Sequence, residues 1–229
     1  MIGSMSVQII VREAEVAESS ADLALLDDRE RARADRKREP APFVTGHALV
    51  RRLLGELLDR DPAGLSFARR CTTCRSELHG KPSLVDAPGW HFSLSYTTSL
   101  AVVAVAEGTE IGVDTEDLTD ADFEGFAGAT LAPEETGAFT DLSGRDLLVA
   151  RARVWARKEA VLKATGHGLV VDPSEVLVSG PDEPPALVAW QAEEPEPPAV
   201  ALADLDLTSG RHRAAVAALA EGPLEIVAG

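Results

Sequence analysis

Cysteine is almost absent from this chain of 229 residues, which contains only Cys71 and Cys74. Two cysteines cannot stabilise a chain of this length, so a disulfide-rich secreted domain is excluded. They form a Cys-x-x-Cys with His79 five residues on, but no second such pair supplies the fourth ligand of a zinc site. An ordinary turn is the favoured interpretation, and a zinc site and a redox pair are the alternatives.

Long apolar runs and basic residues are also scarce. The longest apolar runs, such as 100–106, fall far short of the roughly 20 residues of a bilayer span. No N-terminal stretch has the pattern of a secretion signal. The chain has 22 Lys+Arg and 38 Asp+Glu, so its formal charge is −16. This negative charge argues against nucleic acid and anionic membranes as partners. With 45% hydrophobic residues, we expect a globular, soluble, cytoplasmic protein.

Hydrophobic periodicity and turn residues predict a mixed α+β chain. Residues 43–59 have apolar positions at helical spacing, and Asp61-Pro62 ends the pattern. The predicted helices are 13–38, 43–59 and about 145–165; the predicted strands are 90–95, 100–106 and 111–114; and the Pro- and acid-rich segment 181–198 is a predicted loop. Within the first helical region, 29–38 holds six of the 22 basic residues, which suits a pocket wall for a polyphosphate.

Two short repeats indicate an internal duplication. Residues 101–108 (AVVAVAEG) and 215–222 (AVAALAEG) are identical at six of eight positions, and Asp61-Pro62 recurs as Asp172-Pro173. This pattern predicts two similar α+β halves, 1–115 and 116–229, packed face to face. Only the first copy runs on into acidic residues, so we expect one asymmetric site at the interface of the halves.

Acidic residues with regular spacing mark the candidate site. Asp114 and Glu116 end a predicted strand, where side chains two apart point to the same side and can share one cation. Carboxylate oxygens suit Mg²⁺, which readily shares its shell with phosphate. On the predicted helix 145–165, Trp155, Glu159 and Lys163 lie on one face, so Glu159 is a candidate third carboxylate and Lys163 a candidate phosphate contact.

Two further elements favour phosphate chemistry. The turn Gly80-Lys81-Pro82 presents one lysine, and Ser93 and Ser95 place two hydroxyls on one side of a strand. The combination with Asp-x-Glu and a helical Glu-x-x-x-Lys is far more specific than any of these elements alone. Phosphoryl transfer needs charge neutralisation on the migrating group, which Mg²⁺ and lysines provide.

Four segments resemble the surfactin-type 4′-phosphopantetheinyl transferases. They are GKPSL (80–84), FSLSYTTSLAVVAVA (92–106), IGVDTED (111–117) and WARKEAVLKATGHGL (155–169), and the resemblance covers roughly residues 25–220. It implies a pseudo-twofold monomer with coenzyme A between its halves. It also implies transfer of the 4′-phosphopantetheine arm to a serine of an apo acyl or peptidyl carrier protein, leaving adenosine 3′,5′-bisphosphate. Such carriers serve fatty-acid, polyketide and nonribosomal-peptide synthesis, and the sequence does not select among them.

The resemblance also implies roles for individual residues. Asp114, Glu116 and Glu159 correspond to the Mg²⁺ ligands and, with Lys163, to the catalytic set. The implied contacts to coenzyme A are Lys81, Ser95, Tyr96, Lys163, Glu135, Arg29, Arg31 and Arg33. Tyr96 departs from the family, which usually has histidine there, and tyrosine supplies no positive charge. The base that deprotonates the acceptor serine is Glu159 or a metal-bound water.

Two other functions fit part of this pattern. A metal-dependent phosphodiester hydrolase could use the same acids, but it leaves the lysine turn and the paired serines unexplained. A non-catalytic coenzyme A binding module would bind nucleotide regardless of Asp114. For the transferase, the carrier is acidic like this chain, so docking is expected on a local apolar patch around 119–130, with Phe123 and Phe126.

Overall fold

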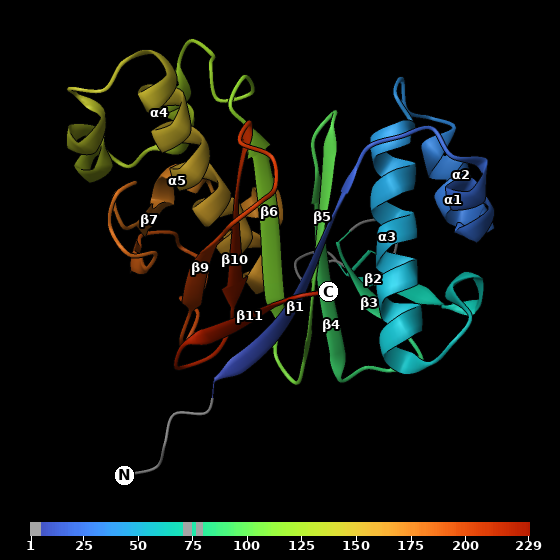
Figure 1. The fold of residues 1–229 in the computed structure, drawn as a ribbon. Helices are drawn as coiled ribbons and strands as arrows, with labels where there is room; N and C mark the ends of the chain where they lie inside the picture. Colours follow the sequence, from blue (N-terminus) through green and yellow to red (C-terminus); the bar gives the residue numbers. More distant parts are fainter. Residues whose placement is uncertain (1–5, 71–74, 77–79) are drawn as a thin grey trace.

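The computed structural model describes residues 6–70, 75–76 and 80–229. Two sheets face each other in the centre of the molecule, with α3 outside the first and α5 outside the second (Figure 1). The helices are α1 (Ser20–Leu25), α2 (Asp28–Ala34), α3 (Ala41–Leu58), α4 (Phe126–Thr130) and α5 (Gly144–Thr165), with 3₁₀ turns η1 (Pro62–Gly64), η2 (Pro133–Phe139), η3 (Gly168–Val170) and η4 (Pro173–Glu175). None of these helices is both long and apolar enough to cross a bilayer.

Eleven strands are assigned in the described residues. They are β1 (Val7–Glu15), β2 (Phe67–Arg70), β3 (Lys81–Leu84), β4 (Trp90–Tyr96), β5 (Leu100–Glu107), β6 (Ile111–Asp117), β7 (Val176–Val178), β8 (Leu187–Trp190), β9 (Ala201–Leu205), β10 (His212–Ala218) and β11 (Leu224–Ala228). The first large sheet has the order β11-β1-β5-β4 and the second β6-β10-β9, and β2-β3 and β7-β8 form two small hairpins. The expected α+β class is confirmed.

Strand β5 shows why the apolar run at 100–106 is a central strand. Its alternate residues Val102 and Ala104 pack in the core between the two sheets, whereas Val103 and Val105 pack against α3. A strand buried on both faces reads as a continuous apolar run rather than as an alternation. Strand β10 behaves likewise: Val216 lies between the sheets, and its neighbouring alanines face α5.

The order of elements in the first part of the chain recurs in the second. In each part a strand is followed by helices, an Asp-Pro 3₁₀ turn, a small hairpin and two strands that pair in the same order, β1-β5-β4 and β6-β10-β9. Asp61 and Asp172 both cap their 3₁₀ turns through the side chain. The duplication itself stays a prediction, and the expected boundary after residue 115 falls inside β6.

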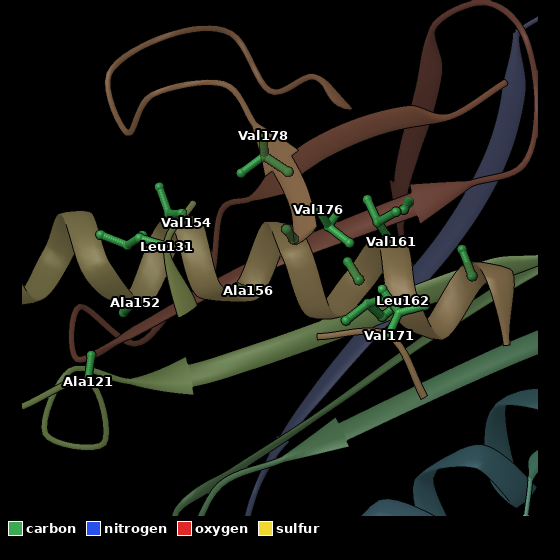
Figure 2. Packing of buried hydrophobic residues seen from close by; sticks show 14 of the residues in the cluster. Ala121, Leu131, Ala152, Val154, Ala156, Val161, Leu162, Val171, Val176 and Val178 are labelled. Atoms are coloured by element: carbon green, nitrogen blue, oxygen red, sulfur yellow. The ribbon is translucent and has the colours of Figure 1, made fainter. Parts of the chain in front are cut away.

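The long helix predicted at 145–165 is confirmed as α5, and Gly166 ends it with a positive φ of 77°. Its buried side chains pack on the second sheet and against β7 (Figure 2). The helix predicted at 43–59 is confirmed as α3.

Two predictions were wrong in part. The region 13–38 begins in β1, where the β-branched residues Val7, Ile9, Ile10 and Val11 are typical of a strand, and then forms two short helices. The predicted loop 181–198 contains β8, because pairing with β7 satisfies the backbone of Leu187–Trp190 despite the nearby prolines. Cys71, Cys74 and His79 lie outside the described residues, so their role stays a prediction.

Candidate active site

Strand β6 carries the two acidic residues on its α5 side. Ile111 and Val113 belong to the core between the sheets, so the alternate residues Gly112, Asp114 and Glu116 face α5. Asp114 is only 3% exposed. The carboxylate of Asp114 is therefore buried between a sheet and a helix, where an unpaired charge is costly in free energy.

Asp114 is bonded to residues from two other elements. Lys163 Nζ of α5 lies 2.5 Å from Asp114 Oδ1, and Ser95 Oγ of β4 donates to the same oxygen at 2.8 Å. Lys163 Nζ also donates to Ser95 Oγ at 3.1 Å. The second carboxylate oxygen, Asp114 Oδ2, is buried and has no hydrogen-bond partner in the described part of the chain. This oxygen is therefore available to another ligand.

The paired serines have different roles. Ser93 Oγ accepts a hydrogen bond from the backbone N–H of Val113 at 3.0 Å, which ties β4 to β6. Ser95, two residues along the same face, reaches the carboxylate of Asp114 instead. The predicted alignment of the two hydroxyls on one side of the strand is confirmed, and it positions Ser95 beside the acids.

Glu116 and Glu159 lie near Asp114, and both of these glutamates have raised pKa values. Burial raises the pKa of Glu116, and the neighbouring charge of Asp114 raises it further. Burial and Asp114 likewise raise the pKa of Glu159, although Lys163 opposes the shift. Three acids and one ammonium share this buried site, and the raised pKa values mean that burial and mutual repulsion disfavour the charged forms of Glu116 and Glu159.

The donor chemistry fits a hard divalent cation, although the ligands are not gathered as a finished metal site. In the described residues, no group of three or more His, Cys, Asp or Glu side chains is arranged to hold a metal ion. Instead, Lys163 bonds to Asp114. The buried, unpartnered Asp114 Oδ2 and the unfavourable concentration of carboxylates are both features that Mg²⁺ would satisfy.

A cavity of about 560 Å³ opens beside Lys163 between the two parts of the chain. Phe92, Leu94 and Tyr96 of β4 line it, together with Lys163 and the residues that follow α5. A second cavity of about 400 Å³ shares Arg33, His47 and Arg69 with the first and extends along α2. The cavities have apolar walls and a cluster of basic side chains, which suits a ligand with both a ring system and phosphates.

Arg33 and Arg69 are the two arginines common to both cavities. Burial lowers the pKa of Arg69 to about 10, and the charge of Arg33 contributes to the same shift. The Arg33 guanidinium stands over the Phe43 ring, 5.4 Å from its centroid. Two cations held close together in a half-buried cavity favour an anion between them.

A buried network holds α2 and its arginines against α3. Glu30 Oε2 accepts a 2.8 Å hydrogen bond from Arg51 Nε, and Glu30 Oε1 lies 2.9 Å from His47 Nδ1. Arg51 is fully buried and also donates to the backbone carbonyl of Leu65 at 3.0 Å. Because Glu30 and Asp27 form the capping box of α2, this network fixes the helix that carries Arg29 and Arg33.

The other predicted cofactor contacts lie in different surroundings. Arg29 lines the second cavity and Tyr96 the first, where its ring meets Phe43 edge-on. Arg31 points away and donates to the carbonyls of Leu23 and Ala24. The structure therefore does not bring Arg31 into the site.

Glu135 is also held elsewhere. Its carboxylate accepts hydrogen bonds from Lys158 Nζ at 2.5 Å, from the backbone of Ala132 at 2.8 Å and from the backbone of Val178 at 2.9 Å. These contacts tie η2 to α5 and β7. Glu135 lines neither of the two cavities.

Lys81 lines the first cavity, but its ammonium already has three acceptors. Lys81 Nζ donates to Glu110 Oε2 at 2.5 Å, to the Ile111 carbonyl at 2.8 Å and to the Ala164 carbonyl at 3.2 Å. It thus joins β3 to the start of β6 and the end of α5.

Two cavity residues, Arg69 and His47, were not expected from the sequence. Arg69 lies two residues after Phe67 on β2, so their alternation could have placed both on one face. His47 is buried and lines both cavities. No sequence signal links it to Glu30, because that contact depends on the packing of α2 on α3.

Comparison with known proteins identifies the family. Residues 110–217, which include the acidic strand and α5, match the 4′-phosphopantetheinyl transferase superfamily. The chain is 33% identical over 181 residues to the 4′-phosphopantetheinyl transferase HetI of Nostoc sp. (strain PCC 7120), an alignment covering 75% of this chain and 73% of that protein. The chain belongs to the 4′-phosphopantetheinyl transferase family.

A second relative extends the comparison. The provisionally named 4′-phosphopantetheinyl transferase slr0495 of Synechocystis sp. (strain PCC 6803) is 31% identical over 167 residues, covering 70% of this chain and 63% of that protein. Membership of the family makes the chain a transferase whose partners are coenzyme A and a carrier protein.

Proposed function

We propose that this transferase moves the 4′-phosphopantetheine arm of coenzyme A to a serine of an apo acyl or peptidyl carrier protein, in the manner of the surfactin-type enzymes. The observation that carries the proposal is the convergence of Arg33, Arg69 and Lys163 on one continuous pair of cavities beside the buried carboxylates of β6 and α5. Cations suit the phosphates of coenzyme A, and the acids suit the metal that accompanies a diphosphate.

The proposed binding mode follows the distribution of charge. Arg33 and Arg69, with Arg29 at the edge, would bind the nucleotide end and its 3′-phosphate. Lys163 would contact the diphosphate, because its ammonium already lies at the junction of the cavity and Asp114. Tyr96 would border the nucleotide without charge, so Arg33 and Arg69 would supply the positive charge that histidine gives in related sequences.

Asp114, Glu116 and Glu159 would hold Mg²⁺, which when bound neutralises negative charge on the diphosphate. The serine oxygen of the carrier would bond to the phosphorus that bears the pantetheine arm. The bond from that phosphorus to the bridging oxygen would break, and adenosine 3′,5′-bisphosphate would leave with that oxygen. Glu159 would accept the serine proton, because its carboxylate lies on α5 close to Asp114 and Lys163.

We also propose that the recurrence of elements reflects an internal duplication. The equivalent residues of β5 and β10 face equivalent layers: Val102 and Val216 lie between the sheets, while Ala101 and Ala215 face a covering helix. The cavity would then lie between two related halves, and the strand β6 that begins the second of them carries Asp114 and Glu116.

The experiment is mass spectrometry of an intact apo peptidyl carrier domain incubated with this protein, coenzyme A and Mg²⁺. A mass increase by one phosphopantetheine arm is expected with the wild type, and none with EDTA or with Asp114→Ala. Release of nucleotide without carrier modification would instead indicate a hydrolase. Coenzyme A binding that is unaffected by Asp114→Ala, with no transfer to any carrier class, would indicate a binding module.

A further inference from the structure

Three arginines near the end of β6 lack a carboxylate partner. Arg145 and Arg151 of α5 and Arg213 of β10 form no ion pair with any acid in the described residues. Their neighbours Arg153 and Arg211, by contrast, pair with aspartates. In a chain with a net charge of −16, these arginines are cationic groups that no ion pair neutralises, although the charge of Asp204 acts on Arg213.

Arg145 and Arg213 converge on a single acceptor. Arg145 Nη2 donates to the carbonyl oxygen of Gly210 at 2.9 Å, and Arg213 Nη1 lies 3.4 Å from the same oxygen. Burial lowers the pKa of Arg213, the charges of Arg153 and Arg145 lower it further, and the charge of Asp204 opposes the shift. Arg213 Nε is buried and has no hydrogen-bond partner within the part of the chain that the structure describes. Arg213 Nη1 also donates to the carbonyl oxygen of His212 at 2.5 Å. Because these acceptors are neutral, both guanidinium groups keep the capacity to bind an anion.

Arg213 connects this arginine group to the acidic site. Arg213 stands directly opposite Glu116 in the antiparallel pairing of β10 with β6, so both side chains point to the same face of the sheet. The connection from β9 to β10, which contains Gly210, lies at the same end of the molecule as the end of β6 (Figure 1). A protein that brings its serine to Glu116 and Glu159 would pass over this surface.

Arg151 joins the group to a cluster of aromatic rings. Its guanidinium lies 5.0 Å from the centroid of the Phe126 ring, and Phe126 contacts Trp155 edge-on at 5.8 Å. Phe123 packs on both rings and is 39% exposed. The apolar patch expected at 119–130 therefore has a basic border.

We propose that Arg145, Arg151 and Arg213 form a docking surface for acidic side chains of the carrier protein. This inference rests on the proposed function. Two acidic proteins repel one another at long range, but salt at physiological strength screens that repulsion beyond about 8 Å. At contact, guanidinium groups without counter-ions attract carboxylates and fix the orientation of the partner. Carrier docking therefore depends on salt, in contrast to the purely apolar docking expected from the sequence.

The test compares Arg145→Glu with Arg60→Glu. Both arginines are exposed and both changes shift the net charge equally, but Arg60 lies beyond the end of α3, away from the site. For Arg145→Glu we expect the KM for an apo peptidyl carrier domain to rise roughly five- to tenfold, with the KM for coenzyme A unchanged. For Arg60→Glu we expect both constants to match the wild type. Increasing NaCl should raise the wild-type KM for the carrier more steeply than that of Arg145→Glu.

The outcomes separate the two proposals. Equal carrier KM values for Arg145→Glu and Arg60→Glu, or a wild-type KM that does not respond to salt, would overturn this inference alone. Absence of transfer by the wild type would overturn the proposed function and this inference with it. Thermal unfolding of both variants shows whether any change arises from loss of the fold.

Discussion

Gly112 of β6 lies against the backbone of α5, and a Cβ atom at this position would stand 2.0 Å from the carbonyl oxygen of Ala160. Only glycine allows the helix to approach the strand this closely. The approach places Lys163, three residues after Ala160, within 2.5 Å of Asp114. The geometry of the candidate site therefore depends on a residue that has no side chain.

We expect Gly112→Ala to lower the free energy of unfolding by at least about 2 kcal/mol, because backbone atoms of α5 cannot give way as a flexible side chain would. Urea unfolding measures this loss. Gly128→Ala is the matched control, since a Cβ there meets nothing within 4 Å. Equal stability of the two variants would contradict the proposed close packing.

Asp114→Ala should reduce the rate of carrier modification by roughly a hundredfold or more, because it removes a proposed metal ligand and the acceptor of Lys163. Coenzyme A binding in EDTA should change far less, since Arg33 and Arg69 remain in the cavity. Single-turnover kinetics and calorimetry measure the two effects. Glu225→Ala, an exposed acid on β11, serves as the control. A parallel loss of binding and rate would argue against the proposed division of roles.

Arg33→Gln should raise the KM for coenzyme A roughly tenfold, while Arg31→Gln should leave it unchanged. The two arginines are neighbours on α2, but Arg33 lines both cavities and Arg31 bonds to the carbonyls of α1. Steady-state kinetics measures the difference. With dephospho-coenzyme A, which lacks the 3′-phosphate, the effect of Arg33→Gln should shrink. An equal effect of both substitutions would show that overall charge, rather than position, governs binding.

We expect Glu110 to stabilise the fold at neutral pH and to lose this effect in acid. Its hydrogen bond with His91, followed by those with Lys81, lowers its pKa to about 2 from an ordinary value of 4.5. A lowered pKa means that the stabilisation is complete above about pH 4.5 and disappears as the pH falls towards 2. Since the Glu110 side chain is 45% exposed, solvent limits the effect to about 1 kcal/mol or less. In urea unfolding, the wild type should have a larger free energy of unfolding than Glu110→Gln at pH 6. The two free energies should become equal near pH 2.5.

Lys81→Met should destabilise the fold by about 1–3 kcal/mol, because its ammonium joins β3 to β6 and to the end of α5. A double-mutant cycle with Glu110→Gln measures how much of this loss comes from their ion pair. Additive effects of the two substitutions would show that the pair contributes nothing beyond its separate members.

Local patterns in the sequence determined the long elements and the acidic centre. Helices α3 and α5 follow from apolar spacing over many turns, and the alternation of β6 correctly places Asp114 and Glu116 on one face. Ser95 and Lys163 were also identified, since their motifs lie on regular elements with fixed periods. These features depend on residues near one another in the chain.

Which charges meet was decided by the packing of elements far apart in the chain. Arg31 and Arg33 look alike in the sequence, but one turns to α1 and the other to the cavity. Glu135 is held by Lys158, and Arg69 enters the cavity from a hairpin that the sequence did not predict. The packing of distant elements determines which groups a long polar side chain contacts, so a periodic sequence pattern cannot predict these contacts. The amino-acid order thus established where chemistry is possible, and the packing of α2, β2 and α5 around the cavity selected the side chains that take part.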